Sequence, residues 1–317
     1  MERTEQEQSE TFVAEQAIAI VGPTACGKTR RAVEAARAFN GEIISADSRQ
    51  VYRMMDLGTG KDLEEYGDVP YHLIDICDPG YKYNLHQYLR DFTKAYSAIQ
   101  ERGRRPVICG GSGMYVENAL KGIRLPDVPE NTELREELQK LSLQELADIL
   151  RTYKTLHNIT DIDTKARAIR AIEIQDYYAR HPEAAAAASA QTATPLDCLV
   201  VGIDISREER RDRISQRLRQ RLDQGMVEEI KSILDSGVDP ESLIYYGLEY
   251  KFVTQYVIGR ISRAEMEHDL EIAIHQFAKR QMTWFRGMEN RGVPIHWIRH
   301  DVSEQEFLKF LTDNLSK

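Results

Sequence analysis

The sequence predicts an α/β protein in which a parallel β-sheet is flanked by helices and interrupted by an all-helical insertion. Three observations favour this fold. An apolar run at residues 18–21 leads through a glycine-framed loop into a helical pattern at residues 30–39. Strand-like and helical segments then alternate in the order β-α-β-β-α-β-α up to residue 121. Residues 131–180 carry three helical patterns without a strand, and a strand pattern returns at residues 199–204.

The glycine-framed loop has the pattern of a phosphate-binding P-loop, which predicts a sheet like that of P-loop NTPases. Gly22 and Gly27 lack a Cβ, so the backbone can turn tightly and approach a ligand. The loop amides and the helix N-terminus would stabilise a diphosphate or triphosphate. Lys28 would add a charge, and Thr29 a hydroxyl for Mg2+. The predicted phosphate-binding residues are Gly22, Pro23, Thr24, Ala25, Cys26, Gly27, Lys28 and Thr29.

The second strand is predicted to end in a carboxylate. Residues 42–46 have a strand pattern and are followed directly by Asp47. Ligands of open parallel sheets bind beyond the carboxyl ends of the strands. We therefore expect Asp47, on a strand neighbouring that of the P-loop, to face the P-loop ligand. The alternative, in which Asp47 or Ser48 only caps a turn, stays open on spacing alone.

Further elements complete the predicted sheet and its helices. The remaining short strands are expected at residues 71–77, 106–109 and 294–298. Asn84 is a plausible N-cap for a helix that ends at residue 101. A second glycine turn, at residues 110–113, leads into a short helix.

Changes in composition divide the chain. We expect a disordered leader at residues 1–16, a catalytic core at residues 17–126 and 197–317, and a helical insertion domain at residues 127–196. Residues 181–195 are rich in alanine and are expected to form a linker or a helix that frays.

The C-terminal part of the chain is predicted to be helical, with one strongly basic helix at residues 207–224. Four arginines lie near one face of this helix at spacings of three and four: Arg210, Arg213, Arg217 and Arg221. A solvated, charge-balanced face is one interpretation, and a ligand contact by one or two of the arginines is the other. Trp284 and Phe285 are expected to be core residues rather than base-stacking residues.

Composition limits the possible functions. The chain has 317 residues and a net charge of −9, which argues against a general polyanion binder, so any nucleic-acid contact needs a local basic face. The four scattered cysteines, without metal-like or disulfide-like spacing, predict a cytoplasmic protein. No apolar run approaches membrane-spanning length, and the polar start does not resemble a signal peptide.

Several segments taken together resemble the tRNA dimethylallyltransferase family. They occur in order from about residue 17 to residue 298, and the order makes the resemblance specific although each segment alone is weak. The matching segments are residues 22–29, 44–52, 55–61, 72–75, 110–115, 167–173 and 278–286.

The resemblance implies transfer of a dimethylallyl group to the N6 amine of the adenosine just 3′ of the tRNA anticodon. The P-loop would then hold dimethylallyl diphosphate with Mg2+, aided by Arg217, and Lys28 would be catalytic. By position, Asp47 matches the general base, and Ser112 matches a residue near the reacting centre. The positions expected to contact tRNA are Asp47, Ser48, Arg49, Gln50, Ser112 and, in the insertion, Arg135, Arg167 and Arg170. The insertion would grip the anticodon arm, and we expect a monomer.

The sequence departs from the family pattern in four places. Cys26 replaces the usual serine of the loop, a mild change because the loop acts through its amides. The other departures are at residues 157–163, 184–190 and 274–276, on or near the expected tRNA surface. They bear on which tRNAs are modified and not on the chemistry.

Three other functions fit parts of the pattern. An adenylate isopentenyltransferase would perform the same chemistry on a free adenine nucleotide, although the insertion and its arginines favour tRNA. A small-molecule kinase would hold ATP in the P-loop and orient an acceptor hydroxyl with Asp47. A non-catalytic RNA-binding module would not need an intact P-loop beside a carboxylate.

Overall fold

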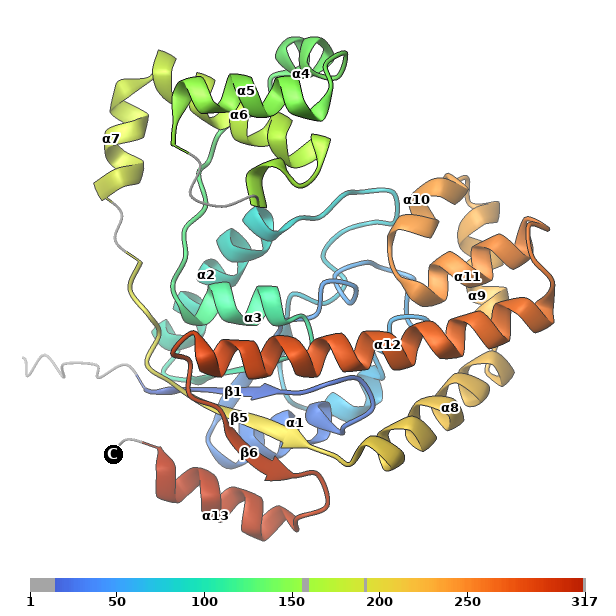
Figure 1. Ribbon diagram of the computed structural model, residues 1–317. Coiled ribbons are helices and arrows are strands. Elements are labelled where there is room, and N and C mark those ends of the chain that lie inside the picture. Colours follow the sequence, from blue (N-terminus) through green and yellow to red (C-terminus); the bar gives the residue numbers. More distant parts are fainter. Residues whose placement is uncertain (1–14, 156–159, 191–192, 316–317) are drawn as a thin grey trace, which may run out of the picture. The chain divides into compact units, whose positions relative to one another are not determined.

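The computed structural model describes residues 15–155, 160–190 and 193–315 (Figure 1). The described residues form two compact units, one from residues up to 122 and from 195 onward, the other from residues 123–194. The leader expected at residues 1–16 lies, up to residue 14, outside the described residues. Its last residue, Gln16, donates to Asp197 at 2.7 Å and so is tied to the first unit.

The first unit is built on a six-stranded sheet in which all recorded strand pairs are parallel, which confirms the predicted fold class. The strand order is β3-β2-β4-β1-β5-β6. The strands are β1 (Ala17–Val21), β2 (Gly41–Ser45), β3 (Tyr71–His72), β4 (Arg105–Gly110), β5 (Cys198–Asp204) and β6 (His296–Arg299). The central strands are continuous buried runs, as expected for a sheet that helices cover on both faces.

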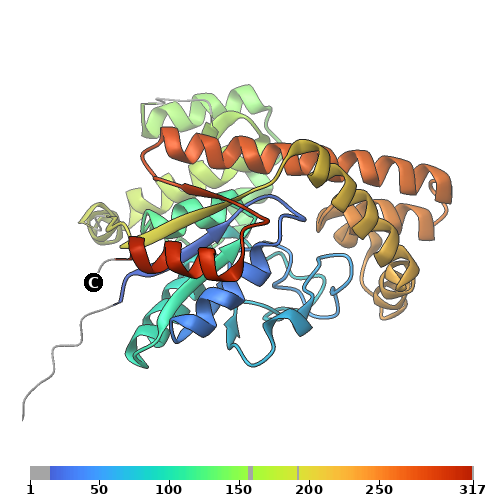
Figure 2. The same cartoon turned by 90° about the horizontal axis from the view of Figure 1, so that it is seen from below.

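The helices of this unit cover both faces of the sheet. Helices α1 and α13 lie side by side on one face, and α2, α3 and α12 lie on the other (Figures 1 and 2). Helices α9, α10 and α11 pack together at one end of α12 (Figure 1). The helices are α1 (Lys28–Ala38), α2 (Leu85–Glu101), α3 (Gly113–Leu120), α8 (Arg207–Asp223), α9 (Met226–Asp235), α10 (Pro240–Tyr245), α11 (Leu248–Val257), α12 (Arg263–Asn290) and α13 (Glu304–Asn314), with a 3-10 turn, η1 (Leu63–Tyr66).

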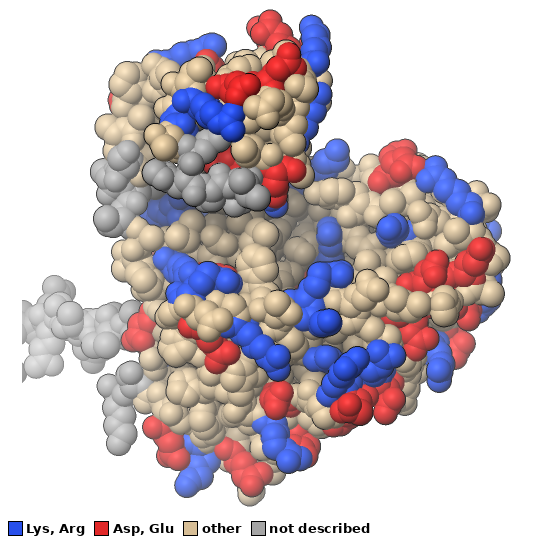
Figure 3. Space-filling model, in the orientation of Figure 1, with Lys and Arg blue, Asp and Glu red and all other residues tan. Residues whose placement is uncertain are grey.

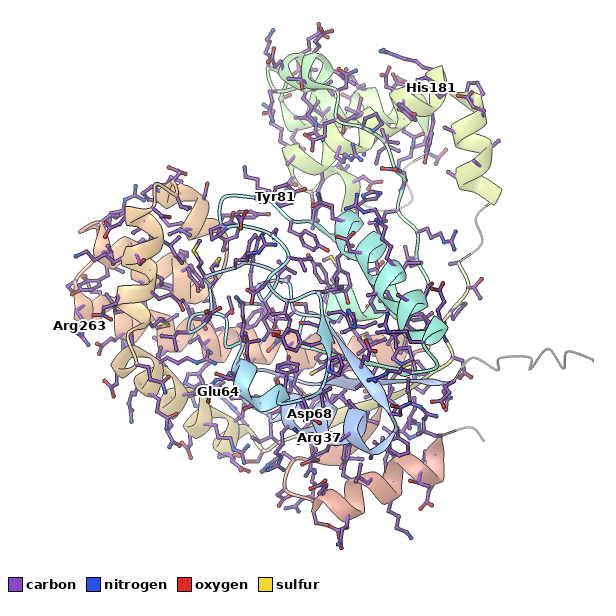
Figure 4. The ribbon with its side chains drawn as sticks, turned by 180° about the vertical axis from the view of Figure 1, so that it is seen from behind. Arg37, Glu64, Asp68, Tyr81, His181 and Arg263 are labelled. Atoms are coloured by element: carbon purple, nitrogen blue, oxygen red, sulfur yellow. The ribbon has the colours of Figure 1, made fainter. Side chains whose placement is uncertain are left out.

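Local signals explain several of the helix ends. Asn84 caps α2 as predicted, because its side chain accepts the Gln87 N–H and the Gln87 side chain accepts the Asn84 N–H. The turn after η1 is tied back to α1, since Arg37 and Asp68 point toward one another and form an ion pair at 3.0 Å (Figure 4).

Two details of the predicted sheet are wrong. The strand expected at residues 71–77 is only two residues long, because Leu73 and Asp75 have left-handed backbone conformations (φ 63° and 55°) that an extended strand does not contain. Strand β2 is also not a direct neighbour of β1, because β4 lies between them. Gly110, at the end of β4, leaves no side chain there, and a Cβ would meet the backbone of Ala46.

The two aromatic residues near the end of α12 differ. Phe285 is fully buried, as predicted for a core residue. Trp284 is 37% exposed and lines a cavity, so the prediction of a core position is wrong for this residue. At adjacent positions of a helix the two side chains point in different directions, and only one can face the core.

The second unit consists of helices, and the three predicted at residues 131–180 are confirmed. These are α4 (Thr132–Leu138), α5 (Leu143–Tyr153) and α6 (Lys165–Arg180), joined by a 3-10 turn, η2 (Thr160–Ile162), and followed by α7 (Pro182–Ala190). A separate apolar core holds them together: Leu138, Leu146, Leu150, Ala168, Ile169 and Ile172. Of the divergent segment at residues 157–163, residues 157–159 lie outside the described part. The alanine-rich segment is helical as far as residue 190.

Candidate functional site

A cavity of about 550 Å³ opens in the first unit beyond the carboxyl ends of β1, β2 and β4. This is the position that open parallel sheets use for ligands. Its walls come from the P-loop (residues 22–29), the turns after β2 and β4, the loop at residues 58–60, and helices α8, α11 and α12. The lining residues with a predicted role are Thr24, Lys28, Thr29, Asp47, Ser48, Arg49, Gln50, Ser112 and Arg217.

The P-loop brings the N-terminus of α1 to this cavity, which Lys28 and Thr29 line. Helix α1 begins at Lys28, and its N-cap is Gly27 (φ 84°), which has no side chain to satisfy the first-turn N–H groups. Such a helix N-terminus binds anions through its amides and its dipole. Ala25 adopts a left-handed conformation (φ 63°), which a non-glycine residue adopts at a cost of about 1–3 kcal/mol. The loop is thus held in its anion-binding shape by its surroundings.

Cys26 is buried within this loop, and its burial raises the pKa of its thiol. A neutral buried thiol packs as a small apolar side chain, so the departure at this position leaves the amide cradle unchanged.

Asp47 lies on the same cavity as Lys28 and Thr29. One oxygen, Oδ1, accepts the N–H of Arg49 at 2.9 Å, so the turn-capping interpretation is correct for that oxygen. No hydrogen bond to the other oxygen is recorded among the described residues. A cavity-lining carboxylate with one oxygen outside the recorded hydrogen bonds can act as a general base toward a bound ligand. Its role remains a prediction.

Ser112 joins the two turns that follow β2 and β4. Its hydroxyl accepts the N–H of Ser48 at 3.0 Å and donates to the Ser48 hydroxyl at 3.2 Å. Arg49 lies 6.0 Å from the ring of Tyr245, an exposed aromatic residue at the end of α10. Ser48, Arg49 and Ser112 are therefore grouped at one wall of the cavity, as the resemblance implies.

Gln50 is placed differently from the other predicted base contacts. Its side chain is buried and accepts the Ser45 hydroxyl at 3.0 Å. Its amide nitrogen donates to the Gly60 carbonyl at 3.2 Å. Through these two hydrogen bonds the Gln50 side chain holds the loop at residues 58–60. Although Gln50 lines the cavity, its amide group is already hydrogen-bonded within the protein.

The loop at residues 56–61 is fixed by buried polar contacts that the sequence did not reveal. Glu229 of α9 accepts the N–H groups of Asp56, Leu57 and Gly58 at 2.7–3.2 Å. Lys61 is fully buried and donates to the Tyr52 carbonyl and to Asp56, both at 2.6 Å. The loop that walls the cavity is therefore rigid.

Arg217 lies on the cavity beside the P-loop and is paired with Arg221, one turn further along α8. Both guanidinium groups donate to Asp62, and both pack where a Cβ of Gly60 would be. Burial and the neighbouring Arg217 charge lower the pKa of Arg221 to about 10, so it stays charged at neutral pH. Two cations share one carboxylate here, and a second carboxyl group, Glu249, also lines the cavity and interacts with both arginines. Burial raises the pKa of Glu249.

A second, more polar cavity of about 440 Å³ lies between α8 and the P-loop. Lys28, Thr29 and Arg217 line both cavities. Over the face seen in Figure 3, basic side chains gather along α12 and α8, with acidic side chains between them. This face therefore carries both signs of charge and is not uniformly basic.

The structure assigns two of the three predicted tRNA-contacting arginines in the second unit to internal contacts. Glu173 of α6 is 1% exposed and accepts Nε and Nη2 of Arg135, both at 2.8 Å. Arg170 also donates to Glu173, and to the Val128 carbonyl at 2.8 Å. Arg167, in contrast, is half exposed, and among the described residues its one recorded ion pair is with the exposed Asp163.

These ion pairs set the charge state of Glu173. Burial alone would raise the pKa of Glu173, but hydrogen bonds from Arg135, the Asn131 N–H and Arg170 outweigh it and hold the pKa below its ordinary value. The carboxylate is therefore a charged structural centre of the second unit.

The residues present fit the Mg2+ that the resemblance implies. Thr29 is on both cavities beside Lys28, and its hydroxyl is a hard oxygen ligand. Among residues 15–155, 160–190 and 193–315, no group of three or more His, Cys, Asp or Glu could hold a metal ion. Mg2+ often keeps several waters and takes its other ligands from one or two side chains and substrate phosphates.

Two residues of α12 line the cavity without having been predicted there: Gln281, which had been given no role, and Trp284, which had been expected in the core. The buried Gln281 accepts the Thr24 N–H and donates to the Gly111 carbonyl, each at 2.9 Å. A helical periodicity places both residues on the sheet side, but nothing in the sequence alone indicates that one of them bonds to the P-loop. Within the described residues, no helix is both long and apolar enough to cross a membrane.

Comparisons with known proteins agree on one family. The profile described as IPP transferase matches residues 50–288, and one described as isopentenyl transferase matches residues 15–66. The chain is 57% identical to a tRNA dimethylallyltransferase of Bacteroides fragilis over 95% of this chain and 98% of that protein. It is also 57% identical to one of Parabacteroides distasonis, over 91% of this chain and 94% of that protein.

Solved structures give the same result. A tRNA isopentenylpyrophosphate transferase of Bacillus halodurans is similar with a TM-score of 0.68 and 32% identity, over 94% of this chain and 95% of that one. A eukaryotic dimethylallyltransferase acting on tRNA is similar in fold, with a TM-score of 0.77 and 19% identity, over 96% of this chain and 81% of that one.

Proposed function

Since this chain belongs to the IPP transferase family, we propose that it transfers a dimethylallyl group from dimethylallyl diphosphate to N6 of the adenosine 3′ of the anticodon in tRNA, releasing diphosphate. The observation that carries the proposal is one cavity lined by both an anion-binding P-loop and a carboxylate, Asp47. Such a cavity can hold an allylic diphosphate and a nucleophile against each other.

The donor half of the reaction needs a stabilised leaving group. As the bond from the allylic carbon to oxygen breaks, negative charge grows on the diphosphate. The amides of the P-loop, the Lys28 ammonium and the Arg217 guanidinium would stabilise that charge, and both charged side chains line the cavity. Mg2+ bound at Thr29 would supply further charge neutralisation on the same oxygens.

The acceptor half needs removal of a proton. The adenine N6 amine is a weak base, and it becomes acidic as its new bond to carbon forms. Asp47, through the oxygen that does not cap the turn, would take this proton as general base. Ser112, which is hydrogen-bonded to Ser48 next to Asp47, would position this general base. The adenosine must leave its stack to reach the cavity, because its amine is otherwise inaccessible.

The partners follow from this chemistry. We propose that the second unit contacts the anticodon arm mostly through shape and phosphate contacts, as is usual for RNA recognition. Arg167 is the predicted contact that remains available there. We also propose that the enzyme is monomeric and cytoplasmic. The free cysteines favour the cytoplasm, where thiols stay reduced.

One assay tests the proposal against its alternatives. Radiolabelled dimethylallyl diphosphate is incubated with the protein and bulk tRNA that lacks the modification, followed by nucleoside analysis. We expect label in N6-dimethylallyladenosine. Label in AMP or ATP but not in tRNA would instead identify an adenylate isopentenyltransferase. A thermal shift with ATP but none with dimethylallyl diphosphate would identify a kinase.

The Asp47→Asn variant tests the general base directly. We expect donor binding to be retained and turnover to fall about a hundred- to ten-thousand-fold, measured under single-turnover conditions. A near-normal rate would remove Asp47 from this role. Asp148→Asn, at an exposed carboxylate of α5, serves as a matched control.

A further inference from the structure

Gln281 connects parts of the first unit that are far apart in sequence. It lies on α12, is 7% exposed, and reaches both the P-loop and the turn after β4. A backbone N–H can bond only to the amide oxygen of Gln281, and a carbonyl only to its nitrogen, so its two contacts fix its orientation. The Gln281 side chain therefore bonds to one backbone donor, the Thr24 N–H, and one backbone acceptor, the Gly111 carbonyl, at the same time.

The fit around this amide is close. A Cβ on Gly111 would be 2.5 Å from the Gln281 nitrogen and 3.3 Å from the Gly22 carbonyl. A glycine at this position is what allows the turn, the P-loop and α12 to meet. Other residue types would push the Gln281 amide out of place.

The contacts continue toward the proposed general base. Gly111 is followed by Ser112, whose hydroxyl accepts the N–H of Ser48, the residue after Asp47. A continuous path of hydrogen bonds and short backbone steps thus runs from the P-loop amide of Thr24 through Gln281 to the Asp47 turn. It joins the wall that would bind diphosphate to the wall that would bind the base.

We propose that Gln281 is a positioning residue that couples the donor half and the acceptor half of the cavity. Occupancy of the P-loop fixes Thr24, Gln281 transmits that order to the turn at Gly111, and Ser112 then holds the Asp47 turn ready for the adenosine. The inference rests on the proposed function, because it assumes that the two halves bind a diphosphate and an RNA base.

Two substitutions separate the two contacts. Gln281→Met has a similar length and loses both hydrogen bonds. Gln281→Glu keeps an acceptor for the Thr24 N–H but, when ionised, has no donor for the Gly111 carbonyl. Gln305→Met, at an exposed position of α13, is the control.

The first measurement does not depend on activity. Hydrogen exchange, followed by mass spectrometry on the peptide spanning the P-loop, reports the protection of the Thr24 amide. We expect at least tenfold faster exchange in Gln281→Met and near-normal exchange in Gln281→Glu and Gln305→Met. Unchanged protection in Gln281→Met would overturn the proposal.

The second measurement is the mutual effect of two ligands. The Kd of inorganic pyrophosphate with Mg2+ is measured with and without a saturating unmodified anticodon stem-loop RNA. We expect the RNA to change the Kd fivefold or more in the wild type and in Gln305→Met, and less than twofold in both Gln281 variants. Equal linkage in all four proteins, or none in the wild type, would overturn the coupling. Failure of the RNA to bind or accept the prenyl group would instead contradict the proposed function.

Discussion

Arginine pairs occur in both units of the molecule, and they are used in opposite ways. In the first unit, Arg217 and Arg221 share Asp62, a carboxylate that is 43% exposed and lies beside the P-loop. In the second unit, Arg135 and Arg170 share Glu173, a carboxylate that is 1% exposed. The family resemblance implied ligand contact for Arg217, Arg135 and Arg170, whereas for Arg221 the sequence left a ligand contact and a solvated helix face open.

The carboxylate makes the difference. Two nitrogens of Arg135 donate to Glu173 at 2.8 Å and the third pairs with Glu130 at 2.7 Å, so each nitrogen of this guanidinium has a carboxylate partner within the protein. Among the described residues, only the Nη2 atom of Arg217 has a recorded partner. A buried carboxylate cannot exchange its cation for a ligand without becoming an unpaired charge, whereas a half-exposed one can.

The largest effect that tests this contrast is on stability. Glu173→Ala leaves two guanidinium groups without their carboxylate, and we expect a loss of about 3 kcal/mol in the stability of the second unit. The value is at the low end for a buried pair because both arginines are about one-third exposed and gain water. Denaturant unfolding and hydrogen exchange of α6 measure it. Asp148→Ala, in an exposed ion pair, should cost less than about 1 kcal/mol.

The same contact predicts a dependence on pH. The pKa of Glu173 is lower in the folded state than in the unfolded chain. Its contribution to stability is therefore complete above the unfolded pKa, about 4.3, and is lost as the pH falls through the folded value. In Glu173→Gln the second unit should lose this part of its acid sensitivity, and an unchanged acid profile would show that the ion pairs do not stabilise it.

The next effect is on binding in the first unit. Arg217→Ala removes a guanidinium whose Nε and Nη1 have no recorded partner among the described residues and can donate to a ligand. We therefore expect inorganic pyrophosphate to bind about ten- to a hundredfold more weakly. Isothermal titration measures this without tRNA. Arg219→Ala removes an exposed arginine of the same helix and should change the Kd less than twofold. Equal effects would mean that only net charge matters.

A smaller effect of opposite sign is expected at the carboxylate. Asp62→Asn removes the carboxylate to which Arg217 and Arg221 donate. A bound diphosphate then no longer competes with Asp62 for these two arginines. We expect pyrophosphate to bind about fivefold more tightly, which corresponds to about 1 kcal/mol of removed repulsion. Weaker binding would mean instead that Asp62 orients the two arginines for the ligand.

Most of the fold could be predicted because local patterns determine it. Buried apolar runs gave β1, β2, β4 and β5, and Asn84 gave the start of α2. The order of strands could not be predicted, because nothing near β2 in the sequence indicates that β4 lies between it and β1. The glycine at position 110 that permits this order also serves as a turn residue, and both uses look alike in sequence.

The candidate site could be predicted where consecutive residues of one motif determine the shape of the backbone. The P-loop is such a motif, and Thr24, Lys28 and Thr29 of it line the cavity. Contacts between distant segments were not predictable. Gln281 bonds to a residue 257 positions away, and Glu173 draws in an arginine 38 positions away. For an arginine, sequence spacing gives the direction of the side chain and not the identity of its partner.

The smallest expected effect separates the remaining arginine of the second unit from the other two. Arg167 is 52% exposed, and within the part of the chain that the structure describes its recorded ion pair is with the exposed Asp163, so it can exchange that partner for a phosphate at little cost. Arg167→Ala should leave stability within about 0.5 kcal/mol and make the plot of log K against log salt for tRNA binding shallower by about one unit. Arg170→Ala should do the reverse, lowering stability with an unchanged slope. If both variants change only the slope, the ion pairs with Glu173 open when tRNA binds, and the contrast between the two units disappears.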